Sequence, residues 1–444
     1  MPHNTPVNES MKKAQSPSVS QDQASIQYRI RGQKPLHGTV RVSGSKNAAL
    51  PILAATVLSK GKTTLTNVPR LSDTRKMCEI LEYLGAVITK DETTVTVDAT
   101  LMKNVAIPHD MVSRMRGSIV LLGPLLARFG EVKMGYPGGC VLGKRSVDSH
   151  MLGFAQMGIV DKSTDNELHL VGFPKSGTVI LPEFSVTATE NILLAAALSK
   201  GVTTIELAAA EPHVQDTAKF LVNRGIRIDG IGSHTLIVHG QSQLLPEGEH
   251  SVVSDYLEAG AFILAALATK GNVRIEGADK SHLTSFLGAV SRVSGKVTCE
   301  KNGDIVVDGA SSNLVGTRIQ TNIFPGFPTD LQSPFGVLLT QAKGVSRIFE
   351  VLFEGRMAYL YELEKMGAHI EVLNSHQALI IGPTSLRGRQ VASNDIRAGV
   401  GMVIAGLAAE GETVITDVHY IERGYDRLEE KLTALGADIV REEV

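Results

Sequence analysis

The stretch NAALPILAATVLSKGKTTLTNV at residues 47–68 contains the pattern that decides the fold. Residues 47–58 are apolar on nearly every face of a helix, which predicts a helix that is enclosed on all sides. Gly61 follows, and a glycine just after a helix adopts the left-handed conformation of a C-cap. The β-branched run TTLTNV at 63–68 then predicts a strand. Helix, glycine and strand together indicate an α/β unit.

This unit recurs along the chain, and each copy adds an amphipathic helix that ends at a second glycine. The glycines that close the apolar helices are Gly61, Gly130, Gly201, Gly271, Gly344 and Gly411. The glycines that end the amphipathic helices are Gly85, Gly158, Gly225, Gly295, Gly367 and Gly436. Each unit alone would leave its apolar helix half exposed, so the units must pack together. Six copies divide into two groups of three, which favours two similar domains; periodicity leaves open a solenoid, a propeller-like ring or two globules.

Composition excludes several classes of protein. With 444 residues the chain is too long for one ordinary core, and its net charge of −2 gives no general attraction to nucleic acid or anionic membrane. The chain contains no run of about 18 apolar residues, which a membrane helix would need. Its start lacks the apolar region of a signal peptide. Three cysteines without CxxC spacing fit a reducing, cytoplasmic location. Residues 1–26 are polar and predict a disordered N-terminal tail.

Two glycine-containing segments predict chemistry, the first an anion-binding site and the second a reactive cysteine. In SGSKNAALPIL at 43–53, Lys46 and Asn47 stand at the start of the apolar helix, where free N–H groups attract phosphate or carboxylate. In YPGGCVLGKRSVDSH at 136–150, the run to Lys144 nearly matches a P-loop. Arg145 replaces the Ser or Thr that would bind magnesium, so we reject a P-loop hydrolase. The loop instead places Cys140 near cations that would make its thiol reactive.

A third set of segments combines carboxylates with arginines. The segments are PTDLQ with Asp330, NDIRAG with Asp395 and Arg397, IERGY with Arg423, FEGR with Arg356 and MRGS with Arg116. Arginine forks suit planar anions, and a carboxylate among cations can act as a base toward a sugar hydroxyl. Each segment alone is more typical of a surface ion pair. The sequence has no zinc motif, EF-hand or GxGxxG motif, so we predict neither a metal nor an organic cofactor.

SGSKNAALPIL, PGGC, FPTDLQ, FEGR, NDIR and IERGY occur in one order and together resemble the UDP-N-acetylglucosamine 1-carboxyvinyltransferases, a family of enolpyruvyl transferases. The resemblance runs from about residue 28 to 443. It implies an enolpyruvyl transferase fold, two inside-out α/β domains built from six βαβαββ repeats. One domain would be 45–253 and the other 27–44 plus 254–444. The implied reaction transfers the enolpyruvyl group of phosphoenolpyruvate to the 3-hydroxyl of UDP-N-acetylglucosamine and releases phosphate, the first committed step of peptidoglycan synthesis.

The resemblance also implies residue roles. Catalytic positions would be Lys46, Cys140, Asp330, Asp395 and Arg423, with Cys140 the target of fosfomycin. Substrate-binding positions would be Lys46, Asn47, Arg116, Arg145, Ser146, Val147, Asp148, Ser149, Val186, Asp330, Leu352, Phe353, Arg356, Arg397 and Arg423. Arg116, Arg145 and Arg423 would surround the phosphate, and Asp330 would take the proton from the 3-hydroxyl.

The chain departs from the family at the nucleotide. Ser146 and Ser149 replace a proline and a leucine, Glu183 replaces a lysine that meets the diphosphate, and Thr187 replaces a glycine. These departures keep alternatives open: a paralogue that uses another UDP-amino sugar, and a catalytically silent regulator. A sister enzyme that makes 5-enolpyruvylshikimate 3-phosphate shares the fold, but the Cys140 loop and the VDSH segment argue against it.

Overall fold

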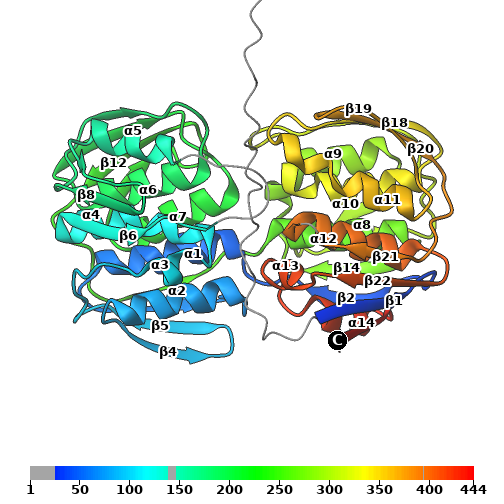
Figure 1. Cartoon of the computed structure of the whole chain (residues 1–444), viewed down its shortest axis with the longest axis horizontal. Coiled ribbons are helices and arrows are strands. Elements are labelled where there is room, and N and C mark those ends of the chain that lie inside the picture. The colour runs from blue at the N-terminus through cyan, green and yellow to red at the C-terminus, as the bar shows by residue number, and fades with distance from the viewer. Residues whose placement is uncertain (1–25, 139–146, 394) are drawn as a thin grey trace, which may run out of the picture.

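A computed structural model describes residues 26–138, 147–393 and 395–444. Its strands form six small sheets around two groups of helices, in two lobes that lie side by side (Figure 1). Each lobe has its own hydrophobic core, one built from residues between 48 and 252 and the other from residues between 28 and 42 and between 256 and 439. The first two strands of the chain therefore belong to the lobe that the second half of the chain completes.

The first lobe contains three sheets. In spatial order they are β13 (Gly248–Ser251), β3 (Lys62–Thr66), β5 (Thr94–Asp98) and β4 (Val87–Asp91); β11 (Arg227–Asp229), β12 (Thr235–Gly240), β10 (Gly201–Glu206) and β9 (Thr178–Ile180); and β6 (Glu131–Gly135), β8 (Glu167–Val171) and β7 (Val160–Asp161). Its helices are α1 (Lys46–Ala55), α2 (Ser72–Tyr83), α3 (His109–Val112), α4 (Leu122–Phe129), α5 (Asp148–Gln156), α6 (Val186–Ala197) and α7 (Pro212–Asn223).

The second lobe repeats this plan. Its sheets are β21 (Gln390–Ala392), β22 (Glu412–Thr416), β1 (Ile26–Arg31) and β23 (Asp438–Glu443); β15 (Val297–Cys299), β16 (Ile305–Asp308), β14 (Asn272–Glu276) and β2 (His37–Arg41); and β17 (Arg318–Gln320), β18 (Gly344–Phe349), β20 (Gln377–Gly382) and β19 (His369–Asn374). Its helices are α8 (Tyr256–Ala268), α9 (Thr284–Arg292), α10 (Gln332–Thr340), α11 (Tyr359–Lys365), α12 (Ile396–Ala408), α13 (His419–Glu422) and α14 (Leu428–Ala434).

The apolar helices lie inside, as the sequence predicts. All residues of α8 and all but the first of α12 are buried, and strands such as β5 and β12 alternate buried and partly exposed side chains. Within each four-stranded sheet, one parallel pair joins neighbouring repeat units, and the other pairs are antiparallel. Apolar helices at the centre and half-exposed sheets outside give the inside-out arrangement that we expected.

The second repeat has only three strands. Where a fourth strand would pair with β6, a single parallel bridge joins Ile107 to Met134. Pro108 follows at once and has no backbone N–H, so it cannot continue a ladder. The expected repeat therefore loses one strand at a position that its sequence explains.

Most of the repeat glycines adopt the expected left-handed conformation, but Gly61, Gly271 and Gly295 do not. Lys270 and Ser294 take positive φ angles of 55° and 62° one residue earlier. At Gly61 a Cβ atom would lie 2.1 Å from the carbonyl oxygen of Pro246, so the glycine permits close backbone approach there. The prediction of left-handed caps was wrong at these three positions.

The chain passes between the lobes twice, at residues 42–45 and 252–255, and the two crossings contact each other. Ser45 donates its N–H to Val253 over 2.7 Å, and Asp255 donates its N–H to Ser43 over 2.8 Å. We propose that the two cores mark two domains with the boundaries expected from the sequence. Of the predicted tail 1–26, only Ile26 lies within the described residues, and it begins β1.

Candidate functional site

Asp330 is the centre of one charged group in the second lobe. It lies in a short 3-10 helix, Thr329–Leu331, directly before α10. Its Oδ1 accepts a 2.6 Å hydrogen bond from Arg356 Nη1, and its Oδ2 accepts one of 3.0 Å from Arg397 Nε. Burial alone would raise the pKa of this carboxyl, but the charges of Arg397 and Arg356 outweigh burial and hold the pKa far below its usual range. Asp330 is therefore ionised at neutral pH.

Both arginines of this group also have contacts outside Asp330. Asp395 is the N-cap of α12, and its Oδ1 accepts from the N–H groups of Arg397 and Ala398 over 2.7 and 2.9 Å. The guanidinium of Arg356 lies 5.0 Å from the centre of the Phe353 ring, a cation–π contact. Leu352, next to Phe353, is partly exposed. Asp395 thus orients the start of α12 rather than bonding a cation directly.

Lys46 and Arg423 form a second charged group through Asp73, at the boundary of the lobes. Arg423 binds both oxygens of Asp73, with Nε 3.1 Å from Oδ1 and Nη2 3.3 Å from Oδ2. Lys46 Nζ lies 3.7 Å from Asp73 Oδ2. Burial lowers the pKa of Lys46, the charges of Arg397 and Arg423 lower it further, and Asp73 opposes the shift. Lys46 therefore lies within the electrostatic influence of both groups.

Lys46 is the first residue of α1, as its motif predicts, and Asn47 follows it. Among the described residues, the side chain of the N-cap Ser45 makes no capping hydrogen bond to the first N–H groups of α1. An uncapped helix start beside a buried lysine has the chemistry of an anion-binding site.

A third group lies in the first lobe, around the start of α5 and α6. His150 Nδ1 accepts a 2.9 Å hydrogen bond from Asn191 Nδ2, which leaves Nε2–H to donate to Thr187 Oγ1 over 3.1 Å. Burial, then the charge of Arg116, lowers the pKa of His150 to about 3. Ser149 donates a 2.6 Å hydrogen bond to Glu183 Oε1. Val147, Asp148 and Val186 begin the two helices.

Arg116, the first residue of a 3-10 helix Arg116–Leu121, thus belongs to this third group. Cys140, Arg145 and Ser146 lie outside the described residues, so their expected roles stay predictions. Sequence reasoning missed Asp73. It also missed Asp426, which accepts a 3.3 Å hydrogen bond from Arg70 Nε, and Glu350, which accepts one of 2.9 Å from Thr329 beside Asp330. An acidic residue in the first turn of a helix, like Asp73, is also typical of a favourable charge at the helix start, so no signal distinguishes it.

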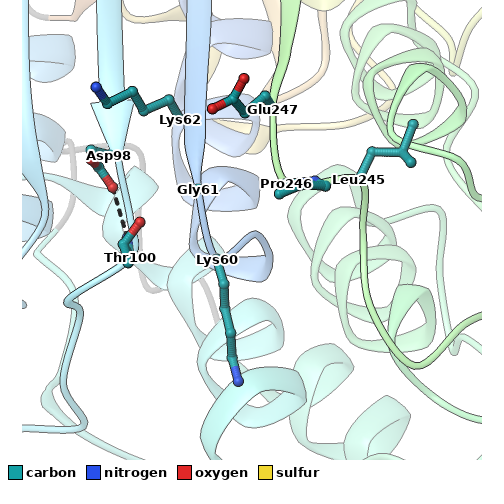
Figure 2. Close-up of a pocket in the computed structure, with 8 residues that line it drawn as sticks. All are labelled: Lys60, Gly61, Lys62, Asp98, Thr100, Leu245, Pro246 and Glu247. Atoms are coloured by element: carbon teal, nitrogen blue, oxygen red, sulfur yellow. Dashed lines mark hydrogen bonds between the residues drawn. The ribbon is translucent and has the colours of Figure 1, made fainter.

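Two cavities are lined by residues outside these groups, and the second of them adjoins the group at Asp73. One of about 440 Å³ lies where residues 60–62 pass residues 245–247, and Lys60 and Lys62 point to different sides of it (Figure 2). Another of about 460 Å³ lies between the lobes, beside Arg70 and Tyr425. No residue of the expected site lines the first cavity. Within the described residues, no cluster of metal-ligand side chains occurs and no helix is long and apolar enough to span a membrane.

Comparisons with known proteins agree with this geometry. The EPSP synthase (3-phosphoshikimate 1-carboxyvinyltransferase) family matches residues 30–432. The UDP-N-acetylglucosamine 1-carboxyvinyltransferases of Magnetococcus marinus and Shewanella amazonensis are each 42% identical to the chain, over 93% of it and 98% of the relative. The enolpyruvyl transferase NikO from Streptomyces tendae has a similar structure, with a TM-score of 0.86 at 24% identity over 95% of this chain and all of that one.

EPSP synthase from Acinetobacter baumannii also has a similar structure, with a TM-score of 0.75 at 19% identity over 94% of this chain and all of that one. At such identities the two structures show the fold, and they confirm the expected enolpyruvyl transferase architecture. The full-length relatives and the family match together show more than the fold. The chain belongs to the EPSP synthase family of carboxyvinyltransferases.

Proposed function

We propose that this protein transfers the carboxyvinyl group of phosphoenolpyruvate to the 3-hydroxyl of UDP-N-acetylglucosamine and releases phosphate. The observation that carries the reaction is the ionised Asp330 held by Arg397 and Arg356, with Lys46 within the influence of the same charges. The curated relatives support this acceptor, because those of 40–42% identity bear the name UDP-N-acetylglucosamine 1-carboxyvinyltransferase.

The reaction needs a proton at the methylene carbon of the enol phosphate and a hydroxyl oxygen at the neighbouring carbon. The carbon–oxygen bond that forms gives a tetrahedral intermediate with a methyl group. Phosphate leaves when the bond between the central carbon and the phosphate oxygen breaks, and the methyl carbon loses a proton, which restores the carbon–carbon double bond. Fixed positive charge stabilises the phosphate in both steps. Lys46 and Arg423, at the lobe boundary, would supply this charge together with Arg116 and Arg145, and Arg397 would bind the carboxylate.

Asp330 would orient the 3-hydroxyl and accept its proton. Its pKa lies well below neutrality while two arginines bind it, and such a carboxylate is a weak base. We therefore propose that substrate anions draw the arginines away as the site closes, which raises the basicity of Asp330 when the proton must move. Cys140 would donate the proton to carbon or assist product release. We also propose a cytoplasmic location, because the proposed donor phosphoenolpyruvate is available there.

One contact favours a second candidate acceptor. Glu183 stands where the resemblance implies a lysine near the diphosphate, and its carboxylate accepts a 2.6 Å hydrogen bond from Ser149. A carboxylate so placed repels a diphosphate. The alternative is therefore a paralogue that acts on a different UDP-amino sugar.

Phosphate release tests both candidates. We expect release from phosphoenolpyruvate with UDP-N-acetylglucosamine, no release with shikimate 3-phosphate, and loss of nearly all turnover in Asp330→Ala. Glu183→Lys, with Glu183→Gln as the control for charge, should lower the KM for UDP-N-acetylglucosamine if the diphosphate passes this position. Release with another UDP-amino sugar alone would select the paralogue, and no release with any acceptor would select the silent regulator.

A further inference from the structure

Two turns from opposite lobes are joined by two ion pairs, and each turn contributes one arginine and one aspartate. Arg70 and Asp73 come from the turn that begins α2, and Arg423 and Asp426 from the turn that follows α13. Arg423 binds Asp73 with two bonds, and Arg70 binds Asp426. These helices lie on the facing sides of the two lobes (Figure 1). We call this reciprocal pair of contacts the clasp.

The half of the clasp at Asp73 consists of contacts between side chains. The Asp73 side chain is 3% exposed and faces Arg423, Lys46 at 3.7 Å and Lys76 at 3.9 Å. A carboxylate between Lys46 and Arg423 occupies a place that a phosphate oxygen could take with the same partners. This half can therefore exchange Asp73 for a substrate anion.

The half at Asp426 includes a hydrogen bond from a backbone N–H group. Asp426 Oδ2 accepts from the N–H of Arg70 over 3.2 Å, from Arg70 Nε over 3.3 Å and from Ser43 Oγ over 3.5 Å. Ser43 lies in the first crossing between the lobes, and its Oγ also accepts from Lys431 Nζ over 2.7 Å. Lys431 in turn pairs with Glu258 of α8 over 2.5 Å. Asp426 therefore links both turns to the connection between the lobes.

We propose that Arg70 and Asp426 are positioning residues that keep the two turns in register while Arg423 exchanges Asp73 for the substrate phosphate. This proposal rests on the proposed function. Without the Arg70–Asp426 half, release of Asp73 by Arg423 would leave the two turns with no ion pair between Arg70, Asp73, Arg423 and Asp426. A displacement of about 1 Å at a group that binds a reacting anion can cost a hundredfold in rate.

The first test measures phosphate release by Arg70→Ala. We expect kcat/KM for phosphoenolpyruvate to fall about tenfold, mostly through a higher KM, and Arg70→Lys to restore most of the loss. Arg75→Ala is the matched control, because Arg75 lines the same cavity between the lobes but pairs at 3.8 Å with Glu79 of its own helix. An equal loss in the control would overturn the proposal.

The second test is a double-mutant cycle with Arg423→Lys. If Arg70 acts through Arg423, Arg70→Ala should lower kcat/KM by less than about twofold in the Arg423→Lys background, because coupled residues are not additive. A full tenfold loss there would overturn the proposal. Should Arg70→Ala not fold, Asp426→Asn removes the same ion pair and keeps an oxygen for the Arg70 N–H, and the same cycle applies.

Small-angle scattering separates this inference from the proposed function. Loss of the contact between Arg70 and Asp426 should let the lobes move apart. Arg70→Ala should therefore have a larger radius of gyration than the unmodified protein, and Arg75→Ala should not. If the unmodified protein is inactive but Arg70→Ala still has the larger radius of gyration, the proposed function alone is refuted. An active unmodified protein whose Arg70→Ala variant matches it in scattering and in kcat/KM would refute the clasp alone.

Discussion

Asp330→Asn tests whether one carboxylate holds two buried guanidinium groups in place. The side chains of Arg356 and Arg397 are only 4% and 6% exposed, and Asp330 is their shared anionic partner. Removing one partner of a buried ion pair costs about 3–5 kcal/mol. The Asp330 side chain is 26% exposed and asparagine keeps one acceptor oxygen, so we expect the lower end, about 3 kcal/mol of unfolding free energy at pH 7.

Urea denaturation followed by circular dichroism measures this loss. Asp98→Asn is the matched control, because Asp98 is a partly exposed residue that accepts a 3.0 Å hydrogen bond from the N–H of Thr100, and it should change stability by less than about 0.5 kcal/mol. Added inorganic phosphate should stabilise Asp330→Asn more than the unmodified protein, since an anion that binds only the folded state raises its stability. Equal stability of the variant and the unmodified protein at pH 7 would refute the ion-pair reasoning.

The ion pairs of Asp330 with Arg356 and Arg397 also predict how stability changes with pH. The folded pKa of Asp330 lies below the unfolded value of about 3.9. Its stabilising contribution is therefore complete above pH 3.9 and is lost as the pH falls from there toward the folded pKa. The stability difference between the unmodified protein and Asp330→Asn should be constant from pH 7 to 5 and should narrow below about pH 4. A difference that narrows instead on the alkaline side would contradict the assignment.

Three further predictions concern other positions. His150 has a pKa lowered to about 3, so it destabilises the fold as the pH falls below about 6.5, by at most about 1.4 kcal/mol per unit; His150→Gln should flatten the acid side of a stability-against-pH curve. Gly123→Ala would place a Cβ 2.2 Å from the Asn191 carbonyl oxygen, and a Tm unchanged by this variant would contradict an expected loss of about 1–3 kcal/mol. Cys140→Asp should keep phosphate release but resist alkylation by fosfomycin, as intact-mass measurement would show; an inactive or alkylated variant would contradict the role implied for the thiol.

The fold could be predicted from the sequence because its strongest signals are local. An apolar helix, a glycine and a β-branched run are each set by a few neighbouring residues, and their repetition reveals the unit. The predictions were wrong where contacts between residues far apart in the sequence determine the local conformation. Gly61 is a glycine because the chain at Pro246 passes close to it, and no local pattern shows a contact across that distance in sequence.

The site was predictable as a set of residues and not as a set of contacts. Lys46, Asp330 and Arg397 could be named from motifs, but the motifs could not pair Asp330 with Arg397, because 67 positions separate them. Asp73 was missed for the same reason. It belongs to no anion-binding pattern, and its role appears only when 350 positions of chain bring Arg423 against it.

The partners of the buried carboxylates suggest which contacts a substrate can replace. Asp255 and Asp395 accept hydrogen bonds from backbone N–H groups at the starts of α8 and α12. Asp73 and Asp330 instead contact the side chains of Arg423, Arg356 and Arg397. An arginine side chain can move to another anion without breaking a helix. A backbone N–H group that bonds a capping carboxylate cannot do so, because it is part of the helix. Asp73 belongs to the first lobe, whereas Arg423 belongs to the second. A substrate anion that takes the place of Asp73 at Arg423 would therefore couple binding to the position of one lobe relative to the other.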